Sequence, residues 1–118
     1  MDLRLDEVNG IKVLRIQGDI TEDRDSLVVT FTDMLSTPHA RIVLDLSCAK
    51  YLNSAALGDL VRMVGQANVQ EARVILAGAP PFIAGLFAAT RLDRFFEQAP
   101  SVEDAMKRLR TPQPVQPV

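Results

Sequence analysis

Ser54 stands where a buried strand gives way to a helix, and its hydroxyl is the group best placed for chemistry. The stretch IVLDLSCAKYLNSAALGDLVRMV, residues 42–64, contains both elements. At the start of a helix, backbone N–H groups lack intrahelical acceptors and favour negative charge. Two interpretations follow from this position. Ser54 caps the helix, as serine does well and as the spacing alone favours, or it carries a phosphate group at modest cost.

Other groups that serve catalysis or metal binding are sparse. The chain has one histidine, His39, after a proline in a predicted loop, and one cysteine, Cys48, expected at a strand end as a small apolar residue. One histidine and one cysteine are a poor ligand set for zinc, and the glycines are too scattered for a phosphate-binding loop. Asp59, in the helix after Ser54, is expected to be a solvated surface charge. The sequence therefore predicts no enzyme, no metal and no other cofactor.

Composition narrows the class of protein. The chain has 118 residues, of which 47% are hydrophobic, so a single domain with a real core is expected. The net charge is −2 and no basic stripe is present, which argues against nucleic-acid binding. No apolar run approaches the length of a membrane span, and the first ten residues have no apolar signal-peptide core. A cytoplasmic protein without direct membrane insertion is expected.

Apolar patterns predict the strands. Apolar and polar residues alternate in segments 2–8 and 11–17, which predicts two strands. Asn9 and Gly10 lie between them and are the strongest short signal for a β-hairpin. Gly18 and Asp19 end the second strand. Residues 41–46 and 73–77 are continuous apolar runs, typical of strands covered on both faces in a parallel sheet. Phe95 and Phe96 suggest a last, short strand.

Helical spacing of apolar residues predicts the helices. The first covers residues 21–36 with Thr21 as its cap, the second starts near Ala55, and the third follows Pro81. Ser101 opens the last helix in a pattern that resembles a capping box. The element order is β-β-α-β-α-β-α-(β)-α. It predicts an α/β domain over residues 1–110, with a mostly parallel sheet of about four or five strands and about four helices. Residues 111–118 carry three prolines and are expected to be a disordered tail.

In such sheets, ligands and partners gather at the carboxyl ends of the parallel strands. Three predicted loops should meet there, over residues 18–21, 47–54 and 78–81. Asp19 and Ser54 would then lie on one rim of the sheet, although they are far apart in the sequence. This places Ser54 on a candidate binding surface.

Five short segments together resemble the STAS domain, a family named for sulfate transporters and anti-sigma factor antagonists. A hydrophobic strand ending in Asp, Leu and Ser is matched at residues 45–47, and the family's turn before the next helix is matched at residues 53–58. Residues 18–20, 90–96 and 101–105 are similar to further family segments. The resemblance covers roughly residues 3–109 and implies the STAS fold.

In the anti-sigma factor antagonist branch, the serine that matches Ser54 is the phosphoacceptor. The resemblance implies a non-enzymatic protein that binds an anti-sigma factor, often a serine kinase of the histidine-kinase-like ATPase type, and thereby frees a sigma factor. Phosphorylation breaks the complex and a phosphatase restores it. The residues then expected to bind the partner are Asp19, Ile20, Thr21, Asn53, Ser54, Ala55, Ala56, Leu57, Gly58, Ala79 and Pro80.

This chain departs from the family pattern at three positions. Asn53 replaces an aspartate and brings no charge beside the hydroxyl, while Ala56 and Arg91 replace glycines. If the backbone at Arg91 is left-handed, arginine costs on the order of 1 kcal/mol there.

Two alternatives stay open. Short STAS proteins also serve as subunits of transporter assemblies, including lipid-type ABC transporters, or as stress-signalling scaffolds, where phosphorylation is not needed. In the very apolar helix after Pro81, an outward-facing Phe82 would mark a contact surface or a homodimer interface.

Overall fold

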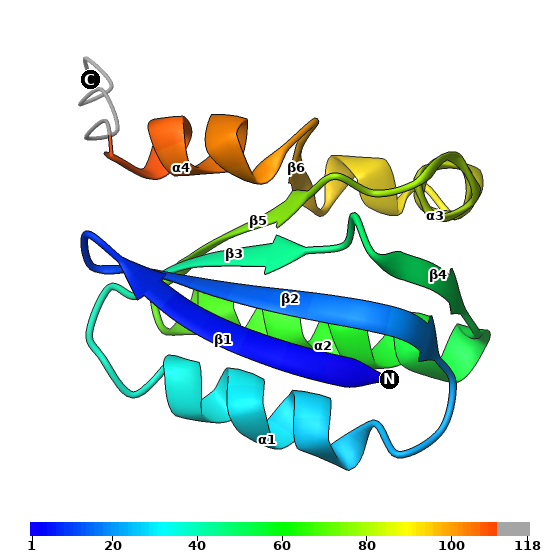
Figure 1. Ribbon diagram of the computed structural model, residues 1–118, viewed down its shortest axis with the longest axis horizontal. Helices are drawn as coiled ribbons and strands as arrows, with labels where there is room; N and C mark the ends of the chain where they lie inside the picture. Colours follow the sequence, from blue (N-terminus) through cyan, green and yellow to red (C-terminus); the bar gives the residue numbers. More distant parts are fainter. Residues whose placement is uncertain (111–118) are drawn as a thin grey trace.

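The computed structural model describes residues 1–110, which form an α/β domain built on one mixed sheet (Figure 1). The chain opens with β1 (Asp2–Val8) and β2 (Ile11–Ile20), an antiparallel pair. Asn9 and Gly10 join them with φ angles of 53° and 78°. Positive φ at both residues is what a two-residue hairpin turn requires. The predicted hairpin is therefore confirmed.

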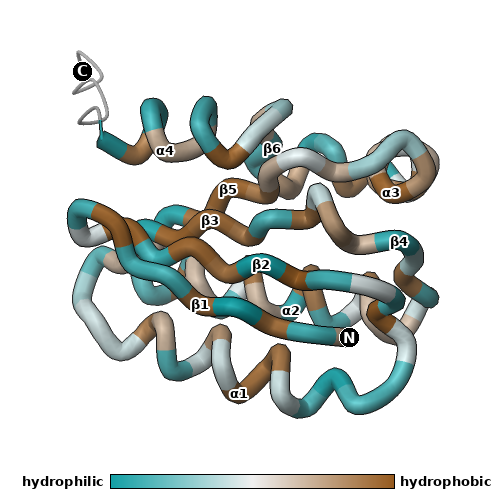
Figure 2. The backbone as a smooth tube through the Cα atoms, viewed as in Figure 1, coloured by the Kyte–Doolittle hydropathy of each residue, from teal (hydrophilic) through white to brown (hydrophobic). Residues whose placement is uncertain are grey.

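Three further strands complete the main path of the sheet and run parallel to β2. They are β3 (Arg41–Asp45), β5 (Arg73–Ala77) and β6 (Glu97–Ala99), and the sheet order is β1-β2-β3-β5-β6. Figure 2 colours the two central strands, β3 and β5, mostly brown because they are continuous apolar runs. Their burial on both faces confirms the prediction made from those runs. The last strand begins after Phe96, whose ring packs in the core instead.

Helices cover both faces of the sheet. One face carries α1 (Asp25–Met34) and α2 (Ser54–Val69), and the other carries α4 (Val102–Arg110) (Figure 1). The larger core lies under α1 and α2, where α3 (Pro81–Ala89) also contributes Ile83 and Phe87. The smaller core joins α4 to the sheet through Ala105 and Leu109. No helix within residues 1–110 is both long and apolar enough to cross a membrane.

A short strand, β4 (Ala49–Leu52), lies inside the segment that the sequence predicted as a loop. It pairs in parallel with the end of β2, after an irregularity at Gly18 where φ is 90°. β2 therefore continues to Ile20, whereas the sequence predicted that Gly18 and Asp19 end it. The strand was missed because only its first and last residues are buried, which gives neither an alternating nor a continuous apolar pattern.

The first helix is shorter than predicted, and Thr21 does not cap it. The residue before the helix is Arg24, whose side chain makes no capping hydrogen bond. Asp23 has a φ of 53°, so the chain turns sharply there before the helix can begin. At the start of α4, by contrast, the Ser101 hydroxyl accepts a hydrogen bond of 3.1 Å from the backbone N–H of Asp104, as predicted.

Arg91 has left-handed backbone angles, with φ 62° and ψ 17°, just before a short 3-10 helix, η1 (Leu92–Arg94). This is the conformation in which a glycine would carry no steric penalty. The predicted disordered tail, residues 111–118, lies outside the described residues.

Candidate functional site

The loop that leaves β3 is held by the carboxylate of Asp45. Its Oδ1 accepts hydrogen bonds from the backbone N–H and the hydroxyl of Ser47, at 3.0 and 2.7 Å. Its Oδ2 accepts one from Nε of Arg15 at 3.1 Å. Gly78 has a φ of 69°, and a Cβ there would lie 3.1 Å from Cβ of Ser47. Two of the three predicted loops therefore meet closely at the carboxyl end of the sheet.

Asn53, not Ser54, caps α2. Its Oδ1 accepts a hydrogen bond of 2.9 Å from the backbone N–H of Ala56, and its backbone is extended, as the residue before a helix requires. The interpretation of Ser54 as the cap is therefore wrong. Ser54 is the first residue of α2 and is exposed, and its hydroxyl has no hydrogen-bond partner within residues 1–110. Because Asn53 caps the helix, the hydroxyl of Ser54 is available for other interactions.

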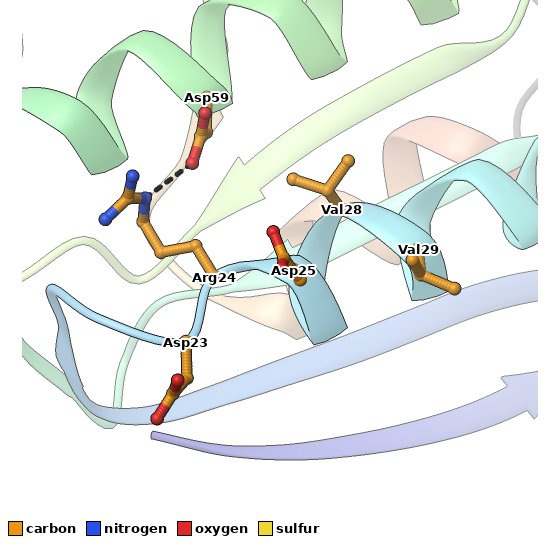
Figure 3. Close-up of a pocket in the computed structure, with 6 residues that line it drawn as sticks. All are labelled: Asp23, Arg24, Asp25, Val28, Val29 and Asp59. Carbon is orange, nitrogen blue, oxygen red and sulfur yellow. Dashed lines mark hydrogen bonds and ion pairs between the residues drawn. The ribbon is translucent and has the colours of Figure 1, made fainter.

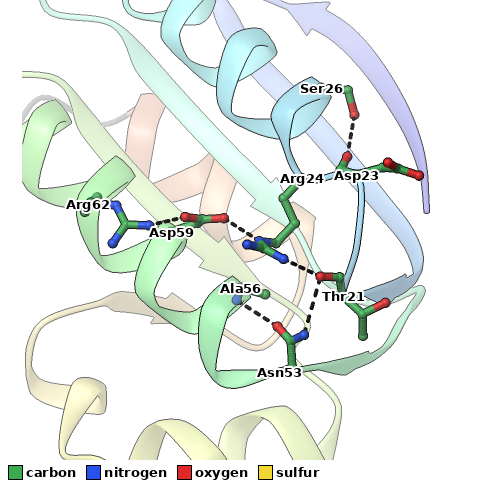
Figure 4. Close-up of polar contacts among 8 residues, drawn as sticks. All are labelled: Thr21, Asp23, Arg24, Ser26, Asn53, Ala56, Asp59 and Arg62. Atoms are coloured by element: carbon green, nitrogen blue, oxygen red, sulfur yellow. Dashed lines mark hydrogen bonds and ion pairs between the residues drawn. The ribbon is translucent and has the colours of Figure 1, made fainter.

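The carbonyl of Thr21 connects the end of β2 to the start of α2 (Figure 4). It accepts a hydrogen bond from Nδ2 of Asn53 at 3.4 Å and another from the guanidinium of Arg24. The backbone N–H of Asn53 also donates to the carbonyl of Ile20 at 3.3 Å. Residues from the first and second predicted loops are thus joined around the helix start, as expected for one rim.

Asp59 is almost fully buried, with 9% of its surface exposed, so the prediction of a solvated charge is wrong. Nε of Arg24 donates to its Oδ2 at 2.6 Å, and the guanidinium of Arg62 donates to its Oδ1. Burial raises the pKa of Asp59, but the hydrogen bonds and charges of Arg24 and Arg62 outweigh burial and hold that pKa below its usual value. Asp59 therefore stays ionised at neutral pH.

A pocket lies beside this ion pair, between α1 and α2 (Figure 3). Asp23 and Asp25 supply carboxylates at its edge, and Val28 and Val29 supply its apolar wall. Arg24 turns toward Asp59, whereas the carboxylate of Asp23 points away from it (Figure 3). Both partners of the Arg24–Asp59 ion pair thus line the pocket between the two helices.

Tyr51 of β4 and Phe82 of α3 form an exposed aromatic pair. Their rings stack with centroids 5.5 Å apart, and the two residues are 44% and 55% exposed. Phe82 thus faces outward, on a helix adjoining Ala79 and Pro80. Tyr51 was not predicted as a site residue, because its strand was not recognised.

Comparison with known proteins identifies the domain. The family model described as "Mlab, STAS domain" matches residues 3–102. The chain belongs to the STAS domain family. The resemblance found in the sequence is therefore confirmed.

Solved STAS structures share the fold. A putative anti-sigma factor antagonist from Thermotoga maritima is 19% identical, with a TM-score of 0.82, over 92% of this chain and 95% of that one. An anti-sigma factor antagonist from Mycobacterium paratuberculosis is 21% identical, with a TM-score of 0.80, over 93% and 94%. The Bacillus cell fate determinant SpoIIAA in its phosphorylated form is 17% identical, with a TM-score of 0.72, over 92% and 100%. The predicted α/β fold is confirmed.

In this STAS domain, the residues predicted to bind a partner differ in accessibility. Asp19, Ser54 and Ala55 are exposed, and six others are partly exposed: Thr21, Asn53, Leu57, Gly58, Ala79 and Pro80. Ile20 and Ala56 are 0% and 1% exposed. Their side chains belong to the core, so they support the surface from below and cannot offer side-chain contacts to a partner.

Cys48 also departs from expectation. It is exposed, and its neighbour Ala49 is the residue that is buried at the start of β4. The Cys48 sulfur lies 3.9 Å from the hydroxyl of Ser47. The loop after β3 thus presents a thiol at the rim of the STAS domain.

Proposed function

We propose that this STAS domain is an anti-sigma factor antagonist whose binding is switched off by phosphorylation of Ser54. It binds an anti-sigma factor that is also a serine kinase, through the surface around the start of α2. The observation that carries the proposal is the state of Ser54. It is exposed at the first position of α2, and its hydroxyl makes no hydrogen bond within residues 1–110, because Asn53 caps the helix.

The position of Ser54 explains how a phosphate would act. A phosphate adds about −1.5 to −2 charges at neutral pH. The start of α2 tolerates this charge, since the helix dipole is positive there and no acidic residue lies in the first turn. A partner surface packed on the same spot would have to bury or repel the new charge. Phosphorylation therefore weakens the complex without requiring the domain to unfold.

The aromatic pair of Tyr51 and Phe82 gives the proposed surface its apolar part. Large aromatic residues that are exposed in the free protein contribute most where a partner buries them. Asp19 and Ser54 supply polar contacts nearby, as residues on the strand and helix that flank β4. The partner expected from this composition is a protein with an apolar pocket. The net charge of −2 and the lack of a basic stripe argue against a nucleic acid.

The proposal is tested with the kinase partner and ATP, by mapping phosphate with mass spectrometry. We expect phosphate on Ser54. We also expect Ser54→Asp to weaken partner binding far more than Ser54→Ala in a calorimetric titration. Ser36→Asp is the matched control, because it adds the same charge at an exposed serine just after α1. Equal affinities for Ser54→Asp and Ser54→Ala would contradict the electrostatic switch.

A second candidate function is favoured by Asn53. Its amide donates to the carbonyl of Thr21, a hydrogen bond that the family's aspartate could not make. The site is thus built around an uncharged residue, which suits permanent docking in a transporter assembly of the lipid-type ABC class or in a stress-signalling scaffold. Affinity purification from native cells separates the candidates. ATPase and permease subunits would support the transporter role, whereas a kinase would support the switch.

A homodimer through Phe82 is the remaining arrangement of the same surface. Measuring the mass of the protein in solution distinguishes a monomer from a dimer. A dimer that Phe82→Ala converts to monomers would mean that the aromatic pair is already covered by a second copy of the chain.

A further inference from the structure

We propose that Arg62 receives the phosphate on Ser54, leaving Asp59 to Arg24 alone. The inference rests on the proposed function, because it concerns phosphorylation of the same serine. It adds a definite response inside the domain. One arginine changes partner, and the pairing between α1 and α2 stays intact.

The first support is the placement of Arg62 along α2. Ser54, Gly58 and Arg62 follow one another at intervals of four residues, which puts successive members side by side on one face of the helix. Long helical side chains lean toward the N-terminus of their helix. The Nη1 atom of Arg62 lies 3.6 Å from the point where a Cβ on Gly58 would be. The guanidinium therefore lies over Gly58, one turn from Ser54.

Because Gly58 has no side chain, the helix surface between Ser54 and Arg62 is open. Neighbouring Cβ positions on the face are about 5–6 Å apart, and a phosphate extends several ångströms from the serine Cβ toward the guanidinium. Nothing larger than glycine stands between them at position 58. Arg62 can therefore meet the phosphate by a small rotation of its side chain.

The second support is that the two arginines paired with Asp59 differ in exposure and in their number of partners. The Arg24 side chain is 28% exposed and also donates to the carbonyl of Thr21. The Arg62 side chain is 73% exposed, and within residues 1–110 its only hydrogen-bond or ion-pair partner is Asp59 (Figure 4). Arg62 is thus the partner that can leave, and Arg24 is the one that stays. After the exchange, the buried carboxylate of Asp59 still has a cation, so its burial remains compensated.

The third support is charge. A phosphate offers more negative charge and more acceptor oxygens than the one carboxylate of Asp59. The planar guanidinium of arginine binds phosphate through two parallel hydrogen bonds, which favours the exchange. The guanidinium then pairs with the phosphate instead of with Asp59. One arginine balances only part of the phosphate's charge, so the surface around Ser54 still becomes more negative. This explains how the domain could lose its partner while its fold persists.

The test uses full-length protein in which phosphoserine is inserted at position 54 during translation, so neither kinase nor partner is needed. Phosphorus NMR follows the second ionisation of the phosphate with pH. A nearby cation favours the dianion, so we expect Arg62→Gln to raise the second pKa of the phosphate by roughly 0.5 units, whereas Arg62→Lys should keep most of the lowering.

Arg4→Gln is the matched control. Arg4 has the same side-chain exposure as Arg62, 73%, but it lies on β1 and pairs with Asp6. If Arg62→Gln and Arg4→Gln give the same phosphate pKa, the inference is overturned, because only the overall charge of the protein would matter. A pKa raised by Arg62→Gln alone supports it.

A second measurement needs no variant at position 62. In nitrogen-resolved NMR of the phosphorylated protein, the Nε–H signal of Arg62 should shift as the phosphate ionises, while that of Arg24 stays in place. A shift at Arg24 instead would overturn the proposed order of exchange. Failure of the kinase to modify Ser54 would contradict the proposed function, yet these titrations would still decide the role of Arg62.

Discussion

Nε of Arg24, the residue before α1, lies 2.6 Å from Oδ2 of Asp59 in the second turn of α2. This contact ties together the two helices that cover one face of the sheet. Arg24 also reaches the carbonyl of Thr21, which Asn53 contacts as well (Figure 4). The buried carboxylate of Asp59 and the side chain of Asn53 therefore both help to fix the start of α2 relative to the end of β2.

Replacing Asp59 should destabilise the fold. Asp59→Asn removes the charge that compensates Arg24, whose side chain is only 28% exposed. The Arg24–Asp59 salt bridge is less exposed than a surface salt bridge but not fully buried. We therefore expect a loss of about 2 kcal/mol in the free energy of unfolding. Urea unfolding measures it. Arg62→Gln is the control and should cost less than about 1 kcal/mol, since Arg62 is exposed. Equal losses for the two variants would contradict the assigned importance of Asp59.

The stability that Asp59 contributes should depend on pH. Burial raises the pKa of Asp59, but the hydrogen bonds and charges of its two arginines prevail, and the folded-state pKa is lowered. The contribution is therefore complete above the unfolded-state pKa of about 3.9 and is lost as the pH falls through the folded-state value.

The free energies of unfolding of wild type and Asp59→Asn should thus differ by a constant amount near neutral pH and converge below about pH 4. Urea titrations at successive pH values measure this difference. A difference that stays constant down to about pH 2 would mean that the pKa of Asp59 is the same in the folded and unfolded states, which would contradict this prediction.

Asn53 should matter more to stability than Ser54. Asn53→Ala removes the capping hydrogen bond to the N–H of Ala56 and should cost about 1 kcal/mol. Asn53→Asp keeps an acceptor for that bond but cannot donate to the carbonyl of Thr21, so its stability should lie between wild type and Asn53→Ala. Ser54→Ala removes no hydrogen bond within residues 1–110 and should cost under about 0.5 kcal/mol. Thermal unfolding ranks the three, and a reversed order for Asn53→Ala and Ser54→Ala would restore Ser54 as the cap.

The stacked pair should carry much of the affinity for the partner. Tyr51→Ala and Phe82→Ala are each expected to weaken binding about tenfold or more, or at least about 1.4 kcal/mol. Both side chains are substantially exposed, so stability should change little. Val69→Ala is the control, because Val69 is 84% exposed at the other end of α2. Calorimetry with the purified partner measures all three. If the aromatic variants bind as well as Val69→Ala, the partner does not use this surface.

Local sequence was sufficient for much of the fold. The central strands β3 and β5 are continuous apolar runs, and the turn at Asn9 and Gly10 needs residues that accept positive φ. Such features depend on neighbours in the chain, so a pattern can reveal them. The strand β4 escaped because its four residues are buried only at its two ends, and it is stabilised by its partner strand β2.

The candidate site was predictable in position but not in its contacts. The segment before α2 contains two good capping residues in succession, and only the backbone angles decide that Asn53 takes the role. Asp59 looks like a surface charge in its own helix, because the arginine that buries it comes from a distant segment. Tyr51 and Phe82 likewise meet only once β4 and α3 are placed side by side.

Asn53 alone connects the end of β4 at Leu52 with the first residue of α2 at Ser54. Since β4 is fixed in register on β2, this connection has no slack. One inserted residue would turn the serine by about 100° around the helix axis and move it about 1.5 Å along that axis. Gly58 would turn with it, because both residues belong to α2, so the face that they share would point in another direction. Evolution can therefore alter the chemistry at this junction by exchanging side chains, but not by lengthening or shortening the chain.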